Sequence, residues 1–99
     1  MTRFDIHMQE GKQILLLNCQ SDYLSHLSTR FVIPLISTGS KPPIATRLNP
    51  VFNINASDYV LATNAAATLS LKHMGGVIGS LAHEQDKIIA AIDILVSGF

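Results

Sequence analysis

The sequence predicts an α+β protein in which a small, barrel-like antiparallel β-sheet precedes one C-terminal α-helix. Short apolar or alternating runs fill the chain before residue 75, and helical spacing of apolar residues begins only after residue 80. No internal linker is long enough to divide 99 residues into two folding units. We therefore expect a single domain over residues 1–99.

The first two strands are expected to form a hairpin. Residues 3–9 (RFDIHMQ) alternate apolar and polar side chains, which predicts a half-buried strand with His7 on its polar face. Residues 10–12 (EGK) have the composition of a turn. Residues 13–19 (QILLLNC) form a continuous apolar run, so the second strand should be more deeply buried and pair antiparallel with the first.

The middle of the chain predicts four more strands and a turn-rich segment. Residues 20–30 are rich in Ser, Asp and Thr, which favour turns. In the strand expected after them, Pro34 should lie at an edge or a bulge, because proline donates no ladder hydrogen bond. Residues 75–80 (GGVIGS) suggest a flexible connector. The strands are expected over residues 30–36, 50–55, 59–63 and 68–74, with a loop at 37–43 and a turn at 55–58.

The last segment predicts the helix. Ser80 is a good N-cap, and Gly98 suits a C-terminal stop after helix residues that run to Ser97. One apolar stripe should pack on the sheet. Its members are Leu81, Ile88, Ile92, Leu95 and Val96, with Ile89 beside them.

Composition excludes several classes of protein. An apolar content of 47% argues against disorder, and zero net charge argues against a broad nucleic-acid-binding surface. The single cysteine, Cys19, precludes an internal disulfide and fits a small buried apolar residue in a reducing cytoplasm. The N-terminus lacks a secretory signal, and no apolar run approaches the ~18 residues that span a bilayer. We expect a cytoplasmic protein without membrane contact.

Motifs for catalysis are scarce. The four histidines do not pair with each other or with Cys19 at metal-ligand spacing, and no G-x-S-x-G motif is present. We therefore expect no catalytic residue, no metal and no cofactor. Two features instead suggest a protein-binding surface: the turn-rich QSDYL (20–24), and a chain that ends on Gly98 and Phe99.

The order of motifs along the whole chain resembles the CcdB toxin family. The matching stretches are FDI (4–6), QSD (20–22), RFVIPL (30–35), LNPVFNI (48–54) and LAHEQDKIIAAIDILVSGF (81–99). The resemblance implies an SH3-like barrel with a C-terminal helix that forms a homodimer. It also implies a toxin of a plasmid or chromosomal toxin–antitoxin pair that is not an enzyme. Such toxins bind the A subunit of DNA gyrase and trap the cleaved-DNA complex, and a partly disordered CcdA-like antitoxin removes them.

The same resemblance implies which residues face gyrase. Members of the family usually carry Trp at the position of Ser97 and an aliphatic residue at that of Tyr23, so this chain departs from the pattern at both. Two alternatives stay open: an inactive relative that only binds antitoxin, and an mRNA interferase of the MazF type. The implied gyrase-binding residues are Tyr23, Leu24, Asp93, Val96, Ser97, Gly98 and Phe99.

Overall fold

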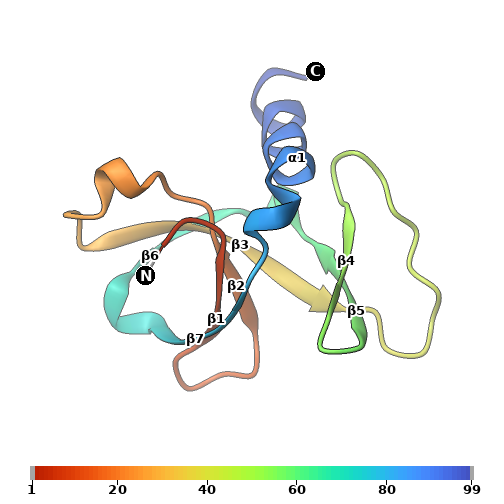
Figure 1. The fold of residues 1–99 in the computed structure, drawn as a ribbon, viewed down its shortest axis with the longest axis horizontal. Coiled ribbons are helices and arrows are strands. Elements are labelled where there is room, and N and C mark those ends of the chain that lie inside the picture. The colour runs from red at the N-terminus through yellow and green to blue at the C-terminus, as the bar shows by residue number, and fades with distance from the viewer. Residues whose placement is uncertain (1, 99) are drawn as a thin grey trace.

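The computed structural model describes residues 2–98 and confirms the expected fold class, a mostly antiparallel half-barrel with one C-terminal helix (Figure 1). Four short 3-10 turns connect its elements. The strands are β1 (Asp5–Gln9), β2 (Leu15–Asn18), β3 (Thr29–Ser37), β4 (Val51–Ile54), β5 (Ser57–Leu61), β6 (Ala67–Ser70) and β7 (Met74–Ser80). The helix is α1 (Gln85–Ser97), and the turns are η1 (Asp22–Leu24), η2 (Thr63–Ala65), η3 (Leu71–His73) and η4 (Ala82–Glu84).

Strand β3 is the centre of the sheet. Along one side it pairs with β2, and along the other it pairs first with β6 and then with β5. The sheet therefore runs in the order β4-β5-β3-β2-β1-β7, with β6 added beside the first half of β3. Because two strands share one side of β3, the sheet divides and curls into a half-barrel, which Figure 1 shows around β3.

Pro34 lies at the point where β3 changes partner, and the expectation of an edge or a bulge is wrong. The residue is inside the central strand and opposite Leu16 of β2. Its carbonyl accepts a hydrogen bond from the Ala62 N–H at 2.9 Å. The nitrogen of a strand residue faces the same side as its carbonyl, so the missing N–H falls at the junction of β5 and β6 and leaves the ladder with β2 intact.

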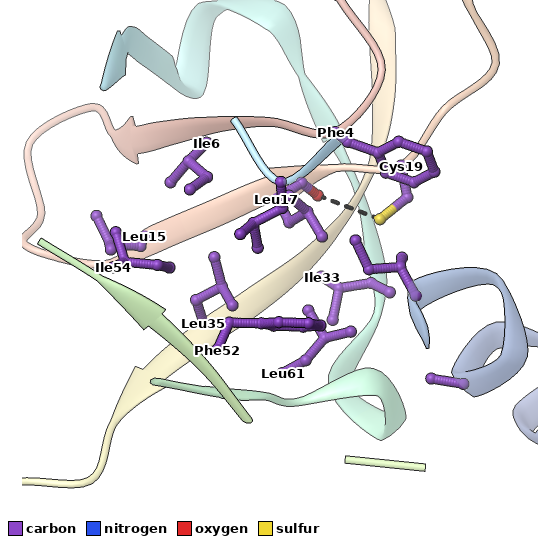
Figure 2. Packing of buried hydrophobic residues seen from close by; sticks show 13 residues of the cluster. Phe4, Ile6, Leu15, Leu17, Cys19, Ile33, Leu35, Phe52, Ile54 and Leu61 are labelled. Atoms are coloured by element: carbon purple, nitrogen blue, oxygen red, sulfur yellow. Dashed lines mark hydrogen bonds between the residues drawn. The ribbon is translucent and has the colours of Figure 1, made fainter. Parts of the chain in front are cut away.

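The apolar core lies on the face of the sheet that α1 covers, and Figure 2 shows its packing. Ile88 and Ala91 of α1 are fully buried against it. The members are Phe4, Ile6, Leu15, Leu17, Cys19, Ile33, Leu35, Phe52, Ile54, Leu61, Leu81, Ile88 and Ala91. Within residues 2–98, no helix has both the length and the apolar character that crossing a membrane requires.

Cys19 is part of this core, as the sequence predicts. Its thiol donates to the Leu17 carbonyl at 3.7 Å, the dashed line in Figure 2. Burial disfavours the thiolate and raises the pKa of Cys19 to about 12, although the positive charge of Arg3 acts in the opposite direction. The residue is therefore held as a neutral thiol.

His7 is buried, contrary to the expectation that it lies on a solvent-facing side of the first strand. Its side chain is 1% exposed. Nδ1 lies 2.8 Å from the Gly75 carbonyl and donates to it, while Nε2 has no hydrogen-bond partner. The alternation of residues 3–9 does not reveal this burial, because the Gly75 carbonyl that His7 contacts comes from β7, a strand far away in the sequence that pairs along one edge of β1.

The glycine-rich segment forms strand β7 and is not a flexible connector. The strand expected over residues 68–74 is divided into β6, η3 and the start of β7. The register of β7 against β1 shifts on both sides of His7. Gly75 lies so close to β1 that a Cβ there would overlap the Met8 carbonyl oxygen. Glycine is therefore needed for close approach and not for flexibility.

The helix begins later than the sequence suggests. Ser80 is not its N-cap: the Ser80 hydroxyl accepts from the Ala82 N–H at 3.1 Å and holds the short turn η4. The helix starts at Gln85 without a side-chain cap. Its end agrees with expectation, because Gly98 adopts φ 79° and donates its N–H to the Ile94 carbonyl at 2.9 Å.

Gly75→Ala should destabilise the protein by about 1–3 kcal/mol, the usual cost of forcing extra volume into a packed site. The added methyl would push β7 away from the Met8 carbonyl. Gly76→Ala is the matched control, because a Cβ at Gly76 meets no atom within 4 Å. Urea unfolding of both variants measures the difference, and equal midpoints would contradict the close approach of β7.

Cys19 should resist alkylation in the folded protein. At pH 8 a thiol with a pKa of about 12 is almost entirely protonated, so iodoacetamide should react on the order of a thousandfold more slowly than with the unfolded chain. The free energy of unfolding should also fall as the pH rises from about 8.5 toward 12, because the Cys19 thiol ionises in that range only in the unfolded chain. Equal rates with and without urea would show that the thiol is accessible.

Candidate protein-binding surface

The apolar stripe of α1 continues past the core and forms an exposed patch at the end of the helix. Ile88 and Ala91 in its first half are buried. In contrast, Leu95 is 42% and Val96 is 76% exposed, so the expectation that these two residues pack on the sheet is wrong. We call residues 93–97 the helix-end patch. Apolar side chains that leave the core on a rigid helix are suited to contact another protein.

The sequence-predicted residues Asp93, Val96 and Ser97 all lie exposed in the helix-end patch. Gly98 follows directly and is exposed. A Cβ at Gly98 would meet no atom within 4 Å, so its left-handed backbone, and not crowding inside the chain, is what favours glycine here. Phe99 lies outside the described residues.

The other two predicted residues lie in the loop between β2 and β3. We call residues 20–29 the loop 20–29; they include η1 and end on Thr29, the first residue of β3, and they expose Tyr23 (87%) and Leu24 (37%). Sequence reasoning missed Leu27, which is 40% exposed beside them. The signal for it was available, because Leu27 follows Leu24 by three residues in a segment that is otherwise rich in polar residues.

Hydrogen bonds at the start of the loop fix η1. The Ser21 hydroxyl accepts from the Tyr23 N–H at 3.2 Å and caps the turn. The Asp22 carboxylate accepts from the Arg3 N–H at 2.9 Å and ties the turn to the beginning of β1. Tyr23 is therefore presented from an ordered backbone although its side chain is free.

The loop and the helix-end patch do not meet in one chain. Figure 1 shows η1 at one end of the molecule and the end of α1 projecting from its middle. The structure brings Asp93, Val96 and Ser97 together, and it brings Tyr23 and Leu24 together, but it leaves the two groups apart. A single target must therefore span both groups or meet them on two copies of the chain.

Two grooves accompany these exposed residues. One, of about 940 Å³, lies on the sheet face opposite the core and is lined by uncharged side chains that include Leu16, Val32 and Leu69. The other, of about 510 Å³, lies between residues 45–51 and α1 and carries Arg47 and Lys87. Within residues 2–98, no three His, Cys, Asp or Glu side chains gather to hold a metal ion.

Comparison with known proteins places the chain in a toxin fold. The family model described as "CcdB protein" matches residues 3–98. A search of curated protein sequences finds no match. Among solved structures, the chain is similar to the Mycobacterium tuberculosis toxin MazF-mt6, with TM-score 0.74, 21% identity, and coverage of 90% of this chain and 92% of that one.

A second solved structure is an endoribonuclease in complex with its cognate antitoxin from a mycobacterial species. Its TM-score is 0.76 at 14% identity, and the match covers 97% of this chain and 94% of that one. A third, a toxin from Mycobacterium tuberculosis ("Mtb toxin"), has TM-score 0.69 at 15% identity, with coverage of 95% and 99%. At these identities the likeness shows a shared fold and does not assign a target.

Proposed function

The chain belongs to the CcdB family of toxin–antitoxin toxins, and we propose that it acts by binding the A subunit of DNA gyrase and trapping the gyrase–cleaved-DNA complex. The observation that carries the proposal is the family match over residues 3–98, which contains both the helix-end patch and the loop 20–29. Trapping of this kind needs tight binding to a reaction intermediate and no catalytic group on the toxin.

The exposed side chains suit such binding. Val96 is held on a helix that Ile88 and Ala91 anchor in the core, so it can contact a target without first becoming ordered. Tyr23 is the most exposed aromatic residue within residues 2–98. Aromatic residues supply much of the binding free energy of small interfaces.

The two departures from the family pattern are related in our proposal. Ser97 removes the aromatic ring that relatives carry at the end of the helix, and Tyr23 adds one in the loop 20–29. We propose that Tyr23 supplies an aromatic contact to gyrase that Ser97 lacks. Phe99 is a further candidate for that contact, by stacking on a cation of the target.

The toxin is proposed to act as a homodimer with its two helix ends near the two-fold axis. Loop and helix-end patch lie apart in one chain, whereas a dimer would offer two copies of each. A symmetric target such as the gyrase A dimer is matched best by a symmetric ligand.

A CcdA-like antitoxin is the proposed natural inhibitor. We propose that a disordered segment of the antitoxin folds onto the exposed apolar surface and displaces gyrase from it. A structure of similar fold, an endoribonuclease in complex with its cognate antitoxin, supports the proposal that this fold binds an antitoxin.

RNA cleavage of the MazF type is the alternative that the fold itself raises. Cleavage requires cations free to bind phosphate beside an acid or a base. The Nε of Arg3 donates to the Cys19 carbonyl, and buried Arg30 donates to three backbone carbonyls. Arg47 lines its groove without a carboxylate or a histidine. The hydrogen bonds of Arg3 and Arg30 thus argue against a phosphate-binding role for these two residues, and the groove that carries Arg47 and Lys87 has no carboxylate or histidine in its lining to act as acid or base.

Tyr23→Ala and Val96→Lys should each weaken gyrase inhibition by about tenfold or more, the effect of losing a contact worth 1.4 kcal/mol or more. The melting temperature of Tyr23→Ala should stay close to that of the wild type, because the side chain is exposed. Supercoiling and cleavage assays with purified gyrase measure the effect.

Ile44→Lys is the matched control for this test, because Ile44 is 83% exposed but lies in the loop 38–50, outside both the loop 20–29 and the helix-end patch. Gyrase inhibition by this variant should equal that of the wild type. If the wild type inhibits no gyrase but cleaves RNA, the protein is an interferase. If it does neither and still binds antitoxin, it is the inactive module.

Light scattering at micromolar concentration should give twice the 10.7 kDa of one chain. Val96→Lys should shift that mass toward the monomer if the helix ends meet at the two-fold axis, because it would bring two positive charges together. Ile44→Lys should leave the mass unchanged. A wild-type mass of one chain would contradict the proposed dimer.

A further inference from the structure

The loop 20–29 is built with its carbonyls turned inward and its apolar side chains turned outward. Tyr23, Leu24 and Leu27 are exposed, while the backbone N–H and carbonyl groups of Leu24, Ser25 and Leu27 are all hydrogen-bonded. A connection of this length without regular structure is usually mobile. Two polar side chains, Gln20 and Arg30, donate five hydrogen bonds to carbonyls of the loop and oppose this motion.

Gln20 fastens the loop at three places. Its Nε2 donates to the Leu24 carbonyl at 3.2 Å and to the Thr29 carbonyl at 3.1 Å. Its Oε1 accepts from the Phe31 N–H at 3.0 Å. One amide therefore joins the start of the loop, its apolar apex and the beginning of β3. This places the Leu24 backbone at a fixed position relative to the sheet.

Arg30 holds the remaining half of the loop. Its Nη1 donates to the Leu27 carbonyl at 2.7 Å and to the Thr29 carbonyl at 2.8 Å, and Nη2 donates to the Ser25 carbonyl at 3.0 Å. The side chain is 6% exposed, and none of the described residues offers it a carboxylate within ion-pair distance. A buried cation without a counterion is costly, so the three carbonyls are its compensation.

We propose that Gln20 and Arg30 are positioning residues for the target-binding surface, holding the loop 20–29 in its binding conformation before the target arrives. The proposal rests on the proposed function and extends it to residues that do not touch gyrase. It also adds Leu27 to the surface, because the Arg30 bond to the Leu27 carbonyl sets that residue beside Tyr23 and Leu24.

A preformed loop strengthens binding because no binding energy is used to order it. If the binding conformation is populated only in part, the apparent affinity falls by that fraction. Association should then slow, because fewer encounters find a competent loop, while dissociation of the complex should change little. This division between the two rates separates a positioning residue from a contact residue such as Tyr23, whose loss should speed dissociation.

Gln20→Met and Arg30→Met remove the donors and keep side-chain length. In each variant we expect faster hydrogen exchange at the amides of Leu24, Ser25 and Leu27, and an affinity for the purified gyrase A subunit about tenfold or more weaker, lost mainly in the association rate. Arg30→Lys keeps a cationic donor and should recover part of the affinity. It also keeps the test available if Arg30→Met fails to fold.

Asn49→Leu is the matched control. Asn49 lies in the loop before β4, and its side-chain amide donates to the Leu61 carbonyl at 3.0 Å, so the variant removes a comparable hydrogen bond far from the loop 20–29 in the sequence. This variant should lose stability without a change in loop exchange or association rate. If the loop amides of Gln20→Met and Arg30→Met exchange faster but both variants associate with gyrase at the wild-type rate, the positioning role is wrong. If Tyr23→Ala binds gyrase like the wild type, the proposed surface itself is wrong, which is a separate outcome.

Discussion

The structure depends on how strand β3 distributes its hydrogen bonds. On one side residues 32–35 pair with β2, while the other side is shared between β6 and β5, so neither of these two strands can extend across the whole of β3. The division forces the sheet to curl. It directs β4 and β5 toward α1 on one side of the half-barrel and leads β6 into the turn that places β7 beside β1.

The exposed apolar residues lie on two separate parts of the half-barrel, and these parts are held rigid by different interactions. The helix-end patch is rigid because the first half of α1 is anchored by apolar packing. The loop 20–29 is rigid because Gln20 and Arg30 satisfy its carbonyls. MazF-type toxins share the fold, so the half-barrel does not set the target by itself; side chains displayed on it do.

Elements whose residue pattern is compatible with only one structure could be predicted from the sequence. The predictions failed where the same pattern is compatible with two structures. Alternation and turn chemistry located the hairpin strands, and Gly98 located the end of the helix. Glycines in residues 75–80 indicate either flexibility or close approach, and only the position of β1 beside Gly75 decides between them. Leu95 and Val96 continue a packed stripe in sequence, but the sheet ends before them.

Strand β7 lies at one edge of the sheet, and its shape bears on whether strands of other copies can add there. An edge strand with a regular row of free N–H and C=O groups is a template on which other copies add to form fibrils. The register of β7 shifts twice within seven residues, and three of these are glycine. A second strand could not follow that irregular outline for more than a few residues. Its close contact with β1 thus also protects this apolar chain from aggregation at that edge.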